Sequence, residues 1–155
     1  MRFLTPIRLC AIVAAAFLLL LYGGSSGCKS ERDYSGIPYI YTDTTIDVTS
    51  AMYKNLEFTG GWGYIPSGYK GIFIYHATEK EFIALERCCT YDPNIFDARV
   101  YYDEDTRVLR DTICGSEFQP WFNGSVTKGP AELPLRPYKT QYYESGALKR
   151  LRIYN

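Results

Sequence analysis

The sequence predicts an all-β protein built from antiparallel strands, arranged as a sandwich or a small barrel. Aromatic residues make up 16% of its 155 residues and include 15 tyrosines, a residue type that suits the half-buried face of a sheet. From Ile37 onward, no stretch of helical length shows a clean 3.6-residue period. Short segments rich in Val, Ile, Tyr and Phe recur instead, separated by Gly, Pro, Asn and Asp, and this pattern is typical of strands and turns.

Three hairpins account for most of the expected strands. Each consists of two β-prone segments joined by a short polar turn. In chain order they are 71–75 with 81–86 across the turn 76–80, 98–102 with 107–110 across the acidic turn 103–105, and 139–143 with 148–154 across 144–147.

Other segments complete the expected domain, which spans residues 37–155. Apolar and polar residues alternate over Ile46–Val48, which indicates a further strand. Residues 50–57 are the best candidate for a short helix, with Ser50 as its cap. Pro and Gly cluster over 120–137, and we expect a long ordered loop there rather than a strand.

Residues 1–27 have the pattern of a secretory signal peptide. Arg2 and Arg8 supply a positively charged head, an apolar run occupies 9–22, and only Gly and Ser occupy 23–27. The apolar run is short for a membrane span, which needs about 20 apolar residues.

Cys28 comes directly after these small residues, and the segment resembles the lipobox at which bacterial lipoproteins are cleaved and lipidated. We expect a lipid on Cys28, followed by a polar tether over residues 28–36. The protein is therefore predicted to be anchored in a membrane of the bacterial cell envelope, facing the periplasm or the cell surface. Two alternatives stay open: an uncleaved apolar anchor, and an ordinary cleavage site that leaves Cys28 as a thiol.

The charge balance excludes a general nucleic-acid binder. The chain has 17 Lys and Arg against 17 Asp and Glu, whereas such a binder would show a basic excess. Loss of residues 1–27 would remove two arginines and no acidic residue, so the mature chain would be slightly acidic. Export to the envelope would also permit disulfides.

The second half of the chain carries a series of short motifs in a characteristic order. They are Arg-Cys-Cys-Thr-Tyr at 87–91, Cys-Gly-Ser-Glu-Phe at 114–118, Asn-Gly-Ser-Val at 123–126, Gly-Pro-Ala at 129–131 and Leu-Pro-Leu at 133–135. Together with the hairpin that precedes them, they resemble a Rieske [2Fe–2S] domain over roughly residues 69–155. The resemblance implies a Rieske-like antiparallel β sandwich with a small former cluster-binding subdomain.

The resemblance places four residues where the family has its cluster ligands, namely Cys89, Tyr91, Asp111 and Cys114. The family uses two cysteines and two histidines, so three of the four positions differ here. His76 is the only histidine in the chain, and it is expected in the first hairpin turn, away from both loops. A Rieske-type cluster is thereby excluded, and we expect no cofactor and no metal. An atypical [2Fe–2S] cluster with two thiolates and oxygen ligands stays open as the alternative.

The resemblance also implies a disulfide between Cys89 and Cys114. In the family, iron holds the two ligand loops together, and an envelope protein without iron can use a disulfide instead. The enclosed segment has about 25 residues, for which the chain-entropy model gives roughly 3–4 kcal/mol. Pairing of Cys88 with Cys114 is the competitor. If Cys89 takes that place, Cys88 is left as a buried or reactive thiol.

No catalytic residue is expected. Ser116 follows a glycine, but the Gly-x-Ser-x-Gly pattern of a nucleophile elbow is absent, which favours a structural role. The acidic turn 103–105 lacks the spacing and the glycine of a calcium loop. Trp62 and Trp121, with the glycine-flanked segment 60–64, leave glycan binding open.

The expected function is a non-enzymatic binding or structural module that is held at the membrane by its lipid. Its partner is predicted to be an envelope protein or a glycan that the sequence does not identify. A redox role, through an atypical cluster or a thiol pair in the loops, is the rival hypothesis.

Overall fold

The computed structural model describes residues 33–34 and 36–155, which belong to one compact unit. The expected signal peptide, the expected lipid site Cys28 and most of the expected tether lie outside the described residues. Within the described part, no helix is long and apolar enough to cross a membrane.

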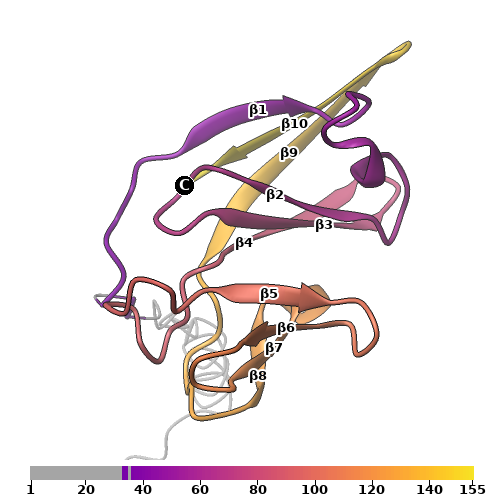
Figure 1. The fold of residues 1–155 in the computed structure, drawn as a ribbon. Coiled ribbons are helices and arrows are strands. Elements are labelled where there is room, and N and C mark those ends of the chain that lie inside the picture. The colour runs from indigo at the N-terminus through magenta and orange to yellow at the C-terminus, as the bar shows by residue number, and fades with distance from the viewer. Residues whose placement is uncertain (1–32, 35) are drawn as a thin grey trace, which may run out of the picture. The chain divides into compact units, whose positions relative to one another are not determined.

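The described residues form ten strands and two short 3-10 helices (Figure 1). In chain order they are β1 (Asp43–Asp47), η1 (Lys54–Glu57), β2 (Trp62–Ile65), β3 (Ile72–Thr78), β4 (Glu81–Glu86), β5 (Val100–Asp103), β6 (Val108–Asp111), β7 (Glu117–Gln119), η2 (Pro120–Phe122), β8 (Ser125–Lys128), β9 (Pro137–Ser145) and β10 (Leu148–Tyr154).

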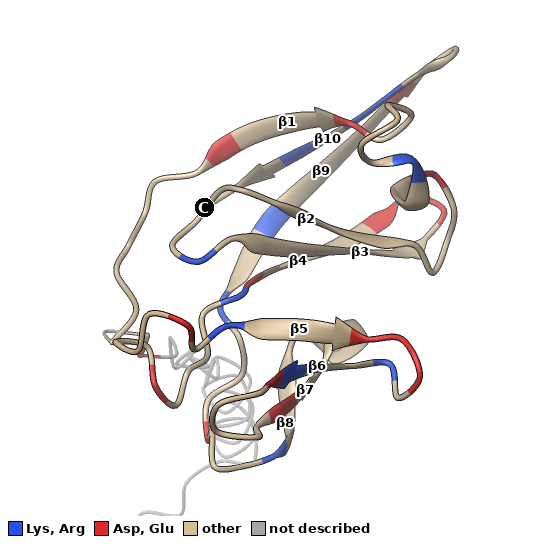
Figure 2. Ribbon diagram, in the orientation of Figure 1, with Lys and Arg blue, Asp and Glu red and all other residues tan. Residues whose placement is uncertain are grey.

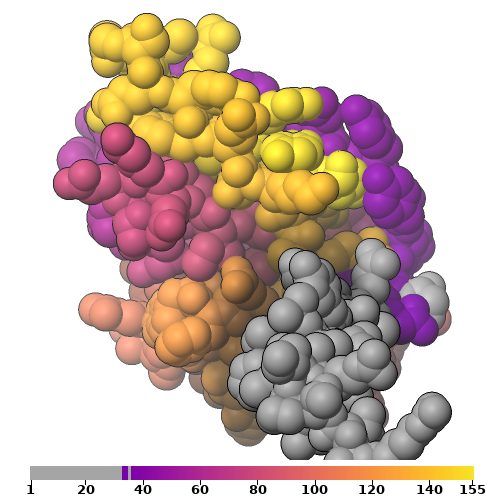
Figure 3. Space-filling model, turned by 180° about the vertical axis from the view of Figure 1, so that it is seen from behind, coloured from indigo at the N-terminus to yellow at the C-terminus, as the bar shows by residue number. Residues whose placement is uncertain are grey.

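The strands make two antiparallel sheets, which confirms the all-β fold class. The larger sheet has six strands in the order β1-β10-β9-β4-β3-β2, so the first strand pairs with the last. The smaller sheet has four strands in sequential order, β5-β6-β7-β8. The three expected hairpins are confirmed as β3–β4, β5–β6 and β9–β10. Figure 3 shows the molecule from behind, with the yellow β9–β10 hairpin at the top of the view.

Two hydrophobic cores hold these sheets together. The first core consists of Ile46, Val48, Leu56, Ile65, Ile72, Ile74, Phe82, Ala84, Tyr138, Leu151 and Ile153. Because it joins both edges of the six-stranded sheet, that sheet curls around it. The second core consists of Phe73, Leu85, Cys89, Ala98, Val100, Leu109, Phe118, Ala131 and Leu135, and it packs the larger sheet against the smaller one.

Strand β3 serves both cores through the two-residue period of its side chains. Ile72 and Ile74 belong to the first core, whereas Phe73 between them belongs to the second. On the smaller sheet, Leu109 and Phe118 meet Phe73 from β6 and β7. The continuous apolar run of β3 is therefore the pattern of a strand that is buried on both faces.

The expected loop over 120–137 is wrong in part, because η2 and β8 lie within it. The expected short helix at 50–57 is confirmed only as η1, and Ser50 does not cap it. The Ser50 hydroxyl instead donates to the Asp47 carbonyl at 2.7 Å, and η1 begins after Tyr53 without a side-chain cap.

His76 was expected in a turn, and this is wrong. It lies within β3, buried, with its ring stacked on Phe82 at 4.1 Å between centroids and 13° between planes. His76 pairs with Phe82 in the regular register of the hairpin, a register irregularity follows between His76 and Thr78, and the turn consists of Glu79 and Lys80. Neither ring nitrogen of His76 has a hydrogen-bond partner.

Candidate functional site: the paired cysteine loops

Two loops and the end of β6 carry the four positions singled out by the family resemblance: Cys89 and Tyr91 lie in the first loop, Asp111 ends β6, and Cys114 lies in the second loop. The first loop, residues 88–99, connects β4 to β5, and the second loop, residues 112–116, connects β6 to β7. Thr90 of the first loop also donates to the Leu133 carbonyl at 2.6 Å, which brings the segment before β9 to the same place.

A buried carboxylate fixes the start of the first loop. Glu86, the last residue of β4, is fully buried and accepts four hydrogen bonds. Oε1 accepts from the backbone N–H groups of Lys70 at 2.8 Å and Cys88 at 3.2 Å. Oε2 accepts from the Tyr69 N–H and the Tyr138 hydroxyl, both at 2.8 Å. These charge-assisted bonds hold β4, β9 and the loop after Ile65 in one arrangement.

The far end of the first loop is fixed by an ammonium group. Lys70 is almost fully buried, and its Nζ donates to the carbonyls of Ile95 and Ala98. Local bonds add to this, since the Ile95 N–H donates to the Asp92 carbonyl and the Ala98 N–H to that of Ile95. The loop is therefore ordered by two buried charges that the sequence analysis did not identify.

Asp111 organises the second loop. Its Oδ1 accepts from the Ile113 N–H at 2.8 Å, and its carbonyl accepts from the Gly115 N–H at 2.9 Å. Gly115 has a φ of 77°, in the left-handed region that glycine adopts without strain. The tight turn places Cys114 at the tip of the loop, beside the first loop.

The two loops meet through their cysteines. The Sγ atoms of Cys89 and Cys114 are 3.6 Å apart, and Oδ2 of Asp111 lies 3.5 Å from the Cys114 sulfur. Ligand atoms of these three residues lie within 4.8 Å of one another. Cys89 and Asp111 are fully buried, whereas Cys114 keeps partial contact with solvent.

The environment keeps the Cys89 thiol protonated. Burial, followed by the neighbouring Asp111, raises the pKa of Cys89 well above its usual value. The Tyr91 backbone N–H acts in the opposite direction but does not outweigh them. A protonated, buried thiol is a poor nucleophile, so the accessible member of the pair is Cys114.

The donor set does not fit a [2Fe–2S] cluster. Such clusters need four soft ligands, usually cysteines, or two cysteines with two histidines. Within the described residues, the group of cysteine, histidine and acidic side chains at this place is limited to Cys89, Asp111 and Cys114. Tyr91, at the fourth position, is 51% exposed. Two sulfurs and one carboxylate leave the second iron without suitable ligands.

The predicted disulfide has its partners in place but is not formed in the structure. A disulfide needs about 2.05 Å between the sulfurs, and Cys89 and Cys114 are both free at 3.6 Å. Cys88 points its thiol at the carbonyls of Cys89 and Pro93, at 3.6 and 3.7 Å. The pairing of Cys89 with Cys114 stays a prediction, and the structure brings these two sulfurs into contact.

Ser116 lies in a structural position. Its hydroxyl oxygen accepts from the Ala131 N–H at 2.9 Å and lies 3.1 Å from the Cys114 sulfur. It is fully buried. The single histidine packs on Phe82 of the first core, whereas Ser116 adjoins Ala131 of the second. No base for a serine nucleophile is therefore present among the contacts of Ser116.

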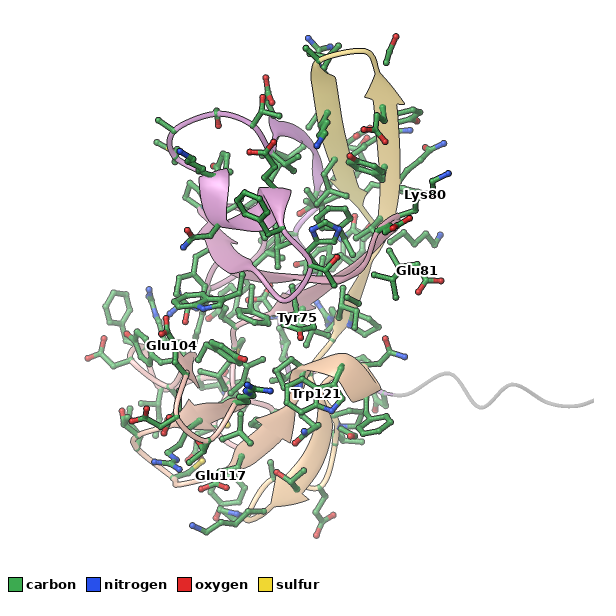
Figure 4. The ribbon with its side chains drawn as sticks, turned by 90° about the vertical axis from the view of Figure 1, so that its right-hand side faces the viewer. Tyr75, Lys80, Glu81, Glu104, Glu117 and Trp121 are labelled. Atoms are coloured by element: carbon green, nitrogen blue, oxygen red, sulfur yellow. The ribbon has the colours of Figure 1, made fainter. Side chains whose placement is uncertain are left out.

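The aromatic residues of the glycan hypothesis lie at the junction of the two sheets. The ring of Trp62 packs against Tyr64 at 5.3 Å and Tyr102 at 5.2 Å, and all three are half-buried. Figure 4 shows Tyr75 of β3 and Trp121 of η2 beside each other, with centroids 6.0 Å apart. The rings contact one another across the sheets, and glycan binding stays a prediction.

The acidic turn after β5 closes on itself. Oδ1 of Asp103 accepts from the N–H groups of Asp105 at 3.0 Å and Thr106 at 3.1 Å, and Oδ2 lies 3.4 Å from Arg110. This is the geometry of a turn stabilised by an aspartate side chain.

No protein-family model matches this chain, and the search among curated proteins found no match.

Proposed function

We propose that this protein is an envelope lipoprotein whose domain is a Rieske-like β fold that has lost its iron–sulfur site and acts as a non-enzymatic binding or structural module. The contact between Cys89 and Cys114 is the observation that carries the proposal. Two loops that are far apart in sequence meet there through residues at former ligand positions, as the family resemblance implies.

The arrangement of the small sheet supports the proposal. Both loops lie at the ends of its strands, and Ala131 and Leu135 of the segment before β9 pack in the same core as Cys89. These three chain segments are the ones whose motifs carry the family resemblance. A disulfide in this place would do mechanically what the metal does in the family, without its redox chemistry.

The chemistry of the site supports a non-enzymatic role. Ser116 is engaged by a backbone N–H, and the only histidine is buried against Phe82. Asp111 is used by the second loop for its own turn. The groups at this site are therefore engaged in holding the loops together.

The absence of a cluster is tested by iron content. Protein produced with full iron supply and purified without oxygen is expected to lack visible charge-transfer absorption and stoichiometric iron. Two irons per chain would contradict the proposal.

Lipid attachment at Cys28 is tested by fractionation of cells. The change Cys28→Ala is expected to move the protein from the membrane to the soluble fraction, because several acyl chains on one residue anchor firmly and none would remain. Cys10→Ala, a change within the expected signal peptide, is the matched control and should leave the protein at the membrane. If the Cys28→Ala protein stays in the membrane, the apolar run itself is the anchor.

A thiol redox role is the second candidate, and the partial exposure of Cys114 favours it. In that case two thiols would form one disulfide, releasing two protons and passing two electrons to an oxidised thiol partner. The reduction potential separates the two roles. Structural disulfides lie below about −300 mV, so a potential above about −200 mV would favour redox exchange.

A further inference from the structure

Three apolar side chains project from the first loop into solvent. Tyr91 is 51% exposed, Ile95 is 45% exposed and Phe96 is 81% exposed. The backbone that carries them is held from below by the Lys70 ammonium, through the Ile95 and Ala98 carbonyls. An ordered loop thus presents large apolar groups to the outside, which is the usual property of a docking surface.

The chain enters the domain beside this loop. A methyl group built on Gly36 would lie 3.1 Å from Cγ of Pro93, in the middle of the first loop. Arg136 donates to the carbonyls of Tyr34 and Ile37, at 2.9 and 2.8 Å, and so fixes the segment where it arrives. Figure 1 shows the indigo segment before β1 reaching the loop that connects β4 and β5.

The length of chain before this point limits how far the loop can be from the membrane. Gly36 comes eight positions after Cys28, so eight Cα–Cα steps connect them. Fully extended they span at most about 30 Å, and as a flexible coil they average about 15 Å. If Cys28 carries the lipid, as the proposed function states, the first loop is held within that distance of the bilayer surface.

The charges of the loop indicate which lipid surface it meets. Asp92 and Asp97 flank Ile95 and Phe96, and Arg99 ends the loop, so its charged side chains are two carboxylates and one guanidinium. Figure 2 shows the red segments of this loop between β4 and β5. The two carboxylates outnumber the one guanidinium, and this net negative charge disfavours an anionic surface and is compatible with ammonium headgroups. Apolar side chains between them can enter the boundary between headgroups and acyl chains.

We propose that the first loop docks on the zwitterionic bilayer that carries the lipid anchor, with Phe96 and Ile95 inserted among the headgroups. This inference rests on the proposed lipid attachment. It assigns the domain a fixed orientation, with its cysteine loops facing the membrane and its β9–β10 hairpin free of it.

The test uses the full lipoprotein in vesicles of phosphatidylcholine and phosphatidylethanolamine, some of them brominated in the acyl chains. Bromine quenches tryptophan fluorescence only at close range, so Phe96→Trp reports whether the loop is inserted. Met52→Trp is the matched control, since Met52 is also 81% exposed but lies in the segment between β1 and η1. Figure 1 shows that segment, at the C-terminal end of β1, away from the loop that connects β4 and β5. Trp62 and Trp121 give a constant background in both variants.

The added tryptophan at position 96 is expected to lose at least half its fluorescence, and the one at position 52 less than a tenth. Replacing half the lipid by phosphatidylglycerol should weaken the quenching at 96, and equal quenching there would overturn the headgroup preference. Protein that floats with the vesicles but leaves Phe96→Trp unquenched would overturn the docking while sparing the anchor. Protein that does not float would overturn both.

Flotation of the Cys28→Ala variant separates the two proposals further. If that variant still floats, the anchor assignment fails, and quenching at position 96 continues to support the docking. A dimer that forms in detergent and is lost in Phe96→Ser would assign the surface to a second copy of this chain and overturn the proposal.

Discussion

Replacement of Glu86 is expected to destabilise the domain more than any surface change of the same kind. Its carboxylate is fully buried and accepts from Tyr69, Lys70, Cys88 and Tyr138. Hydrogen bonds to a charged group contribute about 1.5–3 kcal/mol each, and a buried donor left without a partner costs about 1–3 kcal/mol. The bonds from the N–H groups of Lys70 and Cys88 and from the Tyr138 hydroxyl are buried, whereas the one from the Tyr69 N–H is partly buried.

Glu86→Leu removes all four acceptor contacts and should lower the free energy of unfolding by about 4 kcal/mol. That is a large fraction of the total stability of a domain, which is about 5–15 kcal/mol. Glu86→Gln keeps one carbonyl oxygen, which can still accept from Lys70 and Cys88, but it turns an amide toward the Tyr69 N–H. We expect a loss of about 2 kcal/mol for this change.

Urea unfolding, monitored by tryptophan fluorescence, measures both losses. We expect the slope m, by which the free energy of unfolding falls with urea concentration, to be unchanged. Glu79→Gln is the matched control, because Glu79 is exposed in the β3–β4 turn, and it should change stability by less than about 0.5 kcal/mol. If Glu86→Leu costs less than about 1 kcal/mol, the carboxylate does not hold the first loop, and the explanation of the loop's order is wrong.

Two further predictions concern packing and thiol chemistry. A Cβ on Gly61 would lie 1.7 Å from the Asn55 carbonyl oxygen, so Gly61→Ala should lower the free energy of unfolding by about 3 kcal/mol or more. In the control Gly63→Ala, the added Cβ meets only a side chain at 3.7 Å, and the loss should be under about 1 kcal/mol. Equal losses of the two variants in urea unfolding would contradict this prediction. Burial raises the pKa of Cys88 to about 11, so this thiol stays protonated below that pH, and alkylation of the reduced native protein at pH 8 should modify Cys114 first. Peptide mass spectrometry measures the alkylation rates of Cys88 and Cys114, and equal rates would refute the burial of Cys88.

The sequence was sufficient to predict the hairpins because their strands alternate or are strongly β-prone and their turns are polar. It did not predict β2, because Gly61 and Gly63 lower the strand propensity of that segment. The structure shows why a glycine is needed, since the backbone of η1 at Asn55 occupies the space of a Cβ at position 61. Strand β8 (Ser125–Lys128) was missed because its residues are half-buried or exposed and carry no apolar alternation. Its pairing with β7 is a tertiary contact.

At the site, ligand atoms of Cys89, Asp111 and Cys114 lie within 4.8 Å of one another, and these are three of the four positions that the family resemblance singled out. It could not predict the burial of Lys70 and Glu86, because charged residues at strand ends are usually solvated, and only the tertiary fold surrounds them here. One local observation could have pointed to Glu86: an acidic residue ends a strand whose preceding residues are mostly apolar. His76 continues the regular register of β3 and pairs with Phe82, so the strand extends past the apolar run by which it was predicted.

The most direct test of a covalent link between the two loops is the disulfide map of the protein taken from the envelope. Free thiols are blocked before lysis, and the peptides are then separated without reduction. We predict one linked pair, Cys89 with Cys114, and a blocked free thiol at Cys88. A linkage through Cys88, or free thiols at both 89 and 114, would contradict the claim that a disulfide has replaced the metal between the two loops.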